Sequence, residues 1–139
     1  MNLFAPIAIV ASMLLAGSAY AQEEQRITDA KAAATAWLAL ADAGQYPATW
    51  TSGASAFQAA VSQENWLQAL QQVRTPLGAV KTRTLKSAQY TRSMPNAPAG
   101  EYVVIQYDTT FASKAGAVET VAPMRDKDGS WKVSGYFVR

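Results

Sequence analysis

The 139-residue chain contains no cysteine and no histidine. Without cysteine, no disulfide can hold the fold in an oxidising compartment, so packing must stabilise it alone. Imidazole and thiolate metal sites are excluded, as are nucleophile pairs in which histidine activates serine or cysteine. We therefore expect a protein that is not an enzyme and that needs no cofactor or metal.

Charged side chains are also missing from residues 1–21. An apolar run there ends in Ala19-Tyr20-Ala21, which is typical of a secretory signal peptide cleaved between Ala21 and Gln22. The alternative is a retained anchor, but the run is shorter than the roughly 20 apolar residues of a spanning helix. No cysteine follows it for lipid attachment. We expect a periplasmic or secreted protein, soluble and without a membrane span once residues 1–21 are removed.

The remaining residues, 22–139, are enough for one domain with a single core. Half of the whole chain is hydrophobic, and four tryptophans, six tyrosines and four phenylalanines supply large core side chains. This composition is globular rather than disordered. No internal repeat or second domain is visible.

The hydrophobic period changes once along the chain. Helical spacing predicts helices at 27–43, 54–61 and 63–73, with a short turn of helix at 47–51. Alternation then predicts strands at 79–92, 101–112, 117–125 and 130–138, the last two joined by a tight turn at 126–129. This order predicts an α+β fold, with three amino-terminal helices packed on a curved four-stranded antiparallel sheet.

Several short motifs, in this order and spacing, resemble a known family. They are Trp37-Leu38, Tyr46, Trp50, Arg74-Thr75-Pro76-Leu77-Gly78, and the closing Trp131-Lys132-Val133 strand. Over roughly residues 27–139 the chain is similar to small secreted bacterial proteins grouped as a domain of unknown function, family four thousand and nineteen. The resemblance implies a cystatin-like fold of the nuclear transport factor-like superfamily. It assigns no catalytic residue.

Five aromatic residues are candidates for lining an apolar pocket between the helices and the sheet. Small-ligand pockets are mostly aromatic with a few polar groups, but the same side chains also fill ordinary cores, which we favour here. The candidates are Trp37, Tyr46, Trp50, Trp66 and Tyr107.

Asp108 and Tyr107 raise a second possibility. The superfamily resemblance implies cavities in which an aspartate base and a tyrosine run proton transfer without histidine. Adjacent strand residues face opposite sides of a sheet, however, so the two cannot enter one cavity without a bulge. We expect Tyr107 in the core and Asp108 in solvent.

Residues 65–100 hold five basic residues and no acidic one, although the net charge of the chain is only +2. Five charges over this span favour a solvated strand face over an anion-binding patch, and whether the segment binds anything stays open. The residues are Arg74, Lys81, Arg83, Lys86 and Arg92.

These observations predict an exported, non-enzymatic binding or interaction module of the cell envelope. Its expected partner is a protein or a small apolar ligand, not nucleic acid, and the exposed sheet allows a homodimer. The alternative is a small-ligand-binding or proton-transfer enzyme that uses a cavity between the first helix and the sheet.

Overall fold

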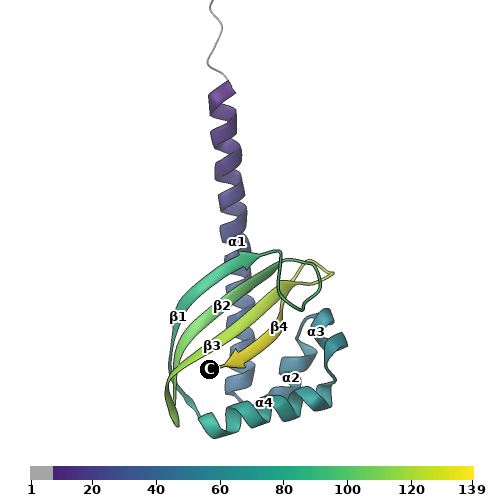
Figure 1. Cartoon of the computed structure of the whole chain (residues 1–139), viewed down its shortest axis with the longest axis vertical. Helices are drawn as coiled ribbons and strands as arrows, with labels where there is room; N and C mark the ends of the chain where they lie inside the picture. The colour runs from purple at the N-terminus through teal and green to yellow at the C-terminus, as the bar shows by residue number, and fades with distance from the viewer. Residues whose placement is uncertain (1–7) are drawn as a thin grey trace, which may run out of the picture.

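The computed structural model describes residues 8–139, with side chains from residue 17 onward, as four helices followed by four strands (Figure 1). The helices are α1 (Ala8–Asp42), α2 (Tyr46–Thr51), α3 (Ser55–Ala60) and α4 (Gln63–Leu77). The strands are β1 (Val80–Thr91), β2 (Tyr102–Phe111), β3 (Lys114–Arg125) and β4 (Trp131–Val138). In the part of the chain that the structure describes, no helix is both long and apolar enough to cross a membrane.

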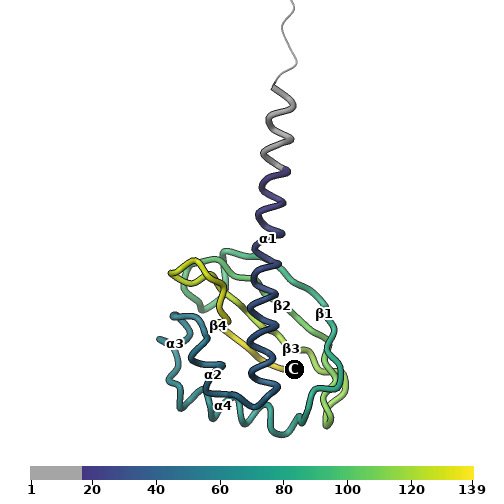
Figure 2. The backbone as a smooth tube through the Cα atoms, turned by 180° about the vertical axis from the view of Figure 1, so that it is seen from behind, coloured from purple at the N-terminus to yellow at the C-terminus, as the bar shows by residue number. Residues whose placement is uncertain are grey.

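The strands form one antiparallel sheet in the order β1-β2-β3-β4. Helix α1 lies across one face of this curved sheet, with α2 and α3 to one side of α1 and α4 at its carboxyl end (Figure 2). The predicted α+β class and the order of helices before strands are therefore confirmed.

One stripe of α1 makes the core. Ala30, Ala34, Trp37, Leu38 and Ala41 are at most 3% exposed and recur at helical spacing. They pack against inward residues of the sheet, among which are Val103, Ile105, Val121 and Val133. Three of the five stripe residues are alanines, so the helix backbone can approach the sheet closely.

The packed part of α1 begins near Arg26. The side chains of residues 17–25 are exposed, and the helix extends beyond the sheet there (Figure 1). Arg26 Nε lies 3.1 Å from Glu101 Oε1 on the sheet side, and Ile27 packs on the core. We expected this helix to start at residue 27; it starts earlier because no proline or glycine pair interrupts the helix-compatible residues before it.

Other boundaries also differ from the predictions. Residues 46–51 form a complete short helix, α2, with Pro47 in its first turn, where a missing N–H costs nothing. Helix α4 continues to Leu77, past the predicted end at residue 73, with Pro76 tolerated in its last turn. Strand β3 starts three residues before the predicted 117 because it pairs up to the turn, Lys114 opposite Phe111.

A bulge in β4 sets the direction of Tyr136. Val121 is opposite Tyr136 and Pro123 is opposite Val133, so β4 carries one residue more than β3 between these pairs. The extra residue breaks the alternation, and Val133 and Tyr136 both join the core. The bulge therefore brings the Tyr136 hydroxyl to the inner face.

Gly78 connects the helical half of the chain to the sheet. Its backbone has φ +76° and ψ −163°, a region that essentially only glycine occupies. A Cβ added there would lie 3.1 Å from the Cβ of Ala112.

We expect Gly78→Ala to lower the free energy of unfolding by about 1–3 kcal/mol. An alanine is strained at this φ and ψ, and its Cβ would also crowd the side chain of Ala112. Urea denaturation measures this loss. The control is Gly116→Ala, where φ is also positive but nothing lies within 4 Å of the added Cβ. An equal loss in the two variants would contradict the role of the Ala112 contact.

Candidate functional site

The most polar part of the interior surrounds Glu119 on β3. This side chain is completely buried, and residues of the three other strands donate hydrogen bonds to it. Arg83 donates from Nε to Oε1 at 2.7 Å and from Nη2 to Oε2 at 3.1 Å. Thr109 donates to Oε1 at 2.6 Å, and Tyr136 donates to Oε2 at 2.5 Å. Each carboxylate oxygen thus accepts two hydrogen bonds.

Asp42, at the end of α1, extends this network toward solvent. It accepts hydrogen bonds from Arg83 Nη1 at 2.7 Å and from Arg83 Nη2 at 3.0 Å. Arg74 of α4 donates to the same carboxylate at 2.8 Å. The Glu119 network, as we call it, connects α1, α4 and all four strands; its members are Asp42, Arg74, Arg83, Thr109, Glu119 and Tyr136.

Charges in the Glu119 network balance, with two guanidinium groups against two carboxylates. Burial raises the pKa of Asp42, but the hydrogen bonds from Arg83 and Arg74 outweigh it and leave that pKa below its ordinary value. Burial lowers the pKa of Arg83, but its two carboxylate partners raise it overall. These shifts keep both ion-pair partners charged.

Tyr136 stays a hydrogen-bond donor. Burial, and then the neighbouring Glu119 carboxylate, raise the pKa of its phenol far above the ordinary value. Its ring packs on Trp37, with the two centroids 5.0 Å apart. The Tyr136 hydroxyl supplies one of the four hydrogen bonds that the Glu119 carboxylate accepts, and it thereby ties β4 to β3.

Sequence reasoning missed this site. Glu119 is in phase with Ala117 and Val121 on β3, so an acidic residue at an inward position was the available signal. Arg83 and Arg74 were grouped as members of a solvated basic segment, yet Arg74 is 5% exposed and its guanidinium lies 5.3 Å from the centroid of the Phe111 ring.

Three of the predicted pocket residues are tryptophans whose indole N–H groups have partners inside the protein. Trp37 donates to the carbonyl of Thr49, and Trp66 donates to the Thr49 hydroxyl, both at 2.9 Å. Trp50 donates to the carbonyl of Val61 at 2.9 Å. Trp37 and Trp66 also contact each other, with centroids 6.2 Å apart, so these rings join the helices to one another.

The two predicted tyrosines belong to different elements, Tyr46 to α2 and Tyr107 to β2. Tyr46 is half-buried at the start of α2, where its carbonyl accepts the Thr49 hydroxyl. Tyr107 is 8% exposed in the core, whereas the side chain of Asp108 is 62% exposed and 4.0 Å from Lys86. Tyr107 and Asp108 therefore face opposite sides of the sheet, as predicted. The predicted homodimer through the sheet stays a prediction.

Among the predicted pocket residues, Trp37 also borders a surface hollow. This α1–β4 groove has a volume of about 200 Å³. The residues that line it are Ala33, Ala36, Trp37, Leu40, Ser52, Trp131, Lys132 and Val133.

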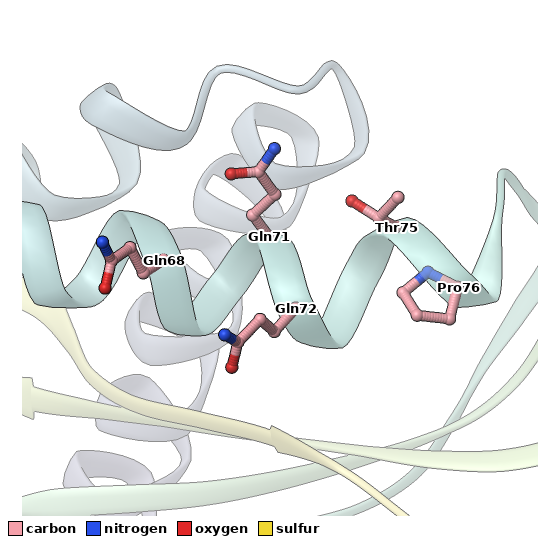
Figure 3. Close-up of a pocket in the computed structure, with 5 residues that line it drawn as sticks. All are labelled: Gln68, Gln71, Gln72, Thr75 and Pro76. Atoms are coloured by element: carbon pink, nitrogen blue, oxygen red, sulfur yellow. The ribbon is translucent and has the colours of Figure 1, made fainter.

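A different hollow lies on α4. Gln68, Gln71, Gln72, Thr75 and Pro76 line it, and Figure 3 shows that all five belong to this one helix. A hollow bounded by the side chains of a single helix has no second wall to enclose a ligand, so we do not regard it as a site.

The fold and these surfaces define a class: an α+β domain with a buried ionic network and shallow surface hollows. A family model described as protein of unknown function (DUF4019) matches residues 33–136, about three quarters of the chain. The chain belongs to this family, as the sequence motifs predicted. Comparison with curated proteins gives no match, and comparison with solved structures gives none either.

The Glu119 network makes a stability prediction. Arg83→Met would leave Glu119 and Asp42 without their shared partner, and we expect a loss of about 3 kcal/mol in the free energy of unfolding. Lys86→Met on the same strand removes only an exposed pair and should cost no more than about 0.5 kcal/mol. Urea denaturation compares the two variants. Equal losses would show that the network does not stabilise the fold.

Proposed function

We propose that this protein is an exported, non-enzymatic binding module that takes a small apolar ligand in the α1–β4 groove. The observation that carries the proposal is the contrast between interior and surface. The acidic and basic groups near the core are bonded to one another in the Glu119 network, whereas the groove exposes apolar walls.

The walls of the groove suit an apolar group. Ala33 and Ala36 on α1 are small and leave room beside the half-buried Trp131 on β4. The charge at the rim is already paired, because Lys132 Nζ lies 3.4 Å from Asp126 and 3.5 Å from Asp128. Aromatic and aliphatic walls with few polar groups are the usual lining of small-ligand sites.

The amino-terminal segment supports export, because its apolar run ends in the cleavage pattern Ala19-Tyr20-Ala21. Removing residues 1–21 leaves Arg26, Ile27 and the remainder of the packed α1 in place. The domain can therefore fold after processing, and we propose a periplasmic or secreted location for it.

Ligand binding is tested with toluene, followed through the indole N–H signal of Trp131 in a two-dimensional NMR spectrum. We expect a saturable shift in the wild type and its loss in Ala36→Leu, which fills the groove. Ala39→Leu, an equal change at an exposed α1 position outside the groove, should keep the shift. No shift in the wild type, or the same response in both variants, would contradict the proposed ligand site.

Processing is tested by expressing the whole chain in a Gram-negative host and weighing the protein from the periplasmic fraction. We expect a mature chain that begins at Gln22. Ala21→Tyr should block cleavage because the position before the cut requires a small residue, whereas Tyr20→Ala should not. Protein that still begins at Met1 in that fraction would contradict the proposal.

A further inference from the structure

A second concave surface lies at the end of the sheet where β3 turns into β4. Two adjoining hollows, of about 510 Å³ and 410 Å³, share residues 99, 100, 125, 126 and 127. They run between α3, the segment that links β1 to β2, and the turn after β3. We call this surface the turn cleft.

One wall of the turn cleft is apolar. Ala56 and Ala59 project from α3, Pro98 comes from the β1–β2 segment, and Met124 ends the apolar part of β3. Met124 is 8% exposed and packs with Tyr102 and Ala54, so this wall rests on a fixed part of the core.

The first of two carboxylates at the turn cleft is Asp126, whose side chain is 5% exposed. It accepts hydrogen bonds from the backbone N–H and the hydroxyl of Ser55, at 3.0 and 2.9 Å, and from the N–H of Lys127 at 2.8 Å. Burial raises its pKa, but these hydrogen bonds prevail and lower it to about 2.

The second carboxylate, Glu101, is also bonded within the protein. It accepts the Tyr90 hydroxyl at 2.9 Å and lies 3.1 Å from Arg26 Nε. Both carboxylates therefore already have partners within the protein, and only Glu101 also reaches one of the cations at the rim, Arg125.

Three cations line the same surface: Arg92, Arg125 and Lys127. Arg125 is 43% exposed and reaches Glu101 only at 3.8 Å. Within residues 17–139, neither Arg92 nor Lys127 has a carboxylate oxygen within the 4.0 Å of an ion pair. The turn cleft thus presents unpaired positive charge beside an apolar wall.

We propose that the turn cleft binds a small amphiphilic anion, with its carboxylate, phosphate or sulfonate group between Arg92 and Lys127 and its apolar body against α3. The site is separate from the α1–β4 groove, so it stands or falls independently of the proposed apolar ligand. A concave surface of this size fits a soluble molecule, and a lipid headgroup is the other source of the same chemistry.

Three probes separate the contribution of the apolar wall from that of the cations. Octanoate carries both the charge and the apolar body, octan-1-ol carries the body without the charge, and acetate carries the charge without the body. Titration followed at the backbone amides of Gly100 and Gly129 should show saturable octanoate binding, with the other two at least tenfold weaker. Octan-1-ol binding as tightly as octanoate would overturn the anion site.

Variants test the cations. Arg92→Gln combined with Lys127→Gln should weaken octanoate binding about tenfold, since the variant loses two charge contacts that are exposed to solvent and therefore individually modest. The matched control is Lys81→Gln combined with Lys114→Gln, two exposed lysines outside the turn cleft. Circular dichroism confirms that both variants are folded. Equal affinity in the two double variants would overturn the proposal.

A vesicle experiment distinguishes the two sources of the anion. We expect the protein to bind octanoate and to stay in solution with phosphatidylglycerol vesicles, as with phosphatidylcholine vesicles. The protein could instead bind phosphatidylglycerol vesicles and not phosphatidylcholine vesicles. If octanoate competes with that binding and the Arg92→Gln, Lys127→Gln variant loses it, the turn cleft binds a lipid headgroup rather than a soluble anion.

Discussion

The hydrogen-bonded ion pair between Arg83 and the buried carboxylate of Glu119 is the constraint on which the rest of this structure depends. A buried carboxylate is strongly unfavourable unless hydrogen bonds and an opposite charge compensate it. Here the three donor residues lie on three different strands, so the compensation exists only when β1, β2, β3 and β4 are paired in this register. A slip of β3 by one residue would turn Glu119 to the outer face.

The same interaction fixes the helices on the sheet. Arg83 bonds Asp42 with the edge of the guanidinium that Glu119 leaves free, and Asp42 also accepts Arg74. The end of α1 and the last turns of α4 are thereby held against β1. A fold without disulfides gains a cross-connection from this arrangement, and the alanine-rich stripe of α1 gains a defined orientation.

Periodicity predicted much of the fold because it reports which face of each element is buried. Helical spacing, as around Trp37, predicted the helices, and alternation, as around Ile105, predicted the strands that follow them. The network was not predictable in this way, because Arg83 and Glu119 are 36 residues apart and meet only through the sheet register. Likewise, the alternation of apolar and polar residues does not reveal the bulge that turns Tyr136 inward. The five aromatic residues predicted to line a pocket serve as core residues and as contacts between helices.

The two surfaces that we propose as ligand sites, the α1–β4 groove and the turn cleft, are edged by β4 or by the turn before it. Both depend on the strand register that the Glu119 network sets. A double-mutant cycle with Arg83→Met and Glu119→Leu tests this claim most directly. The account predicts a coupling free energy of about 2 kcal/mol or more between the two positions. Additive losses, with a coupling near zero, would contradict it.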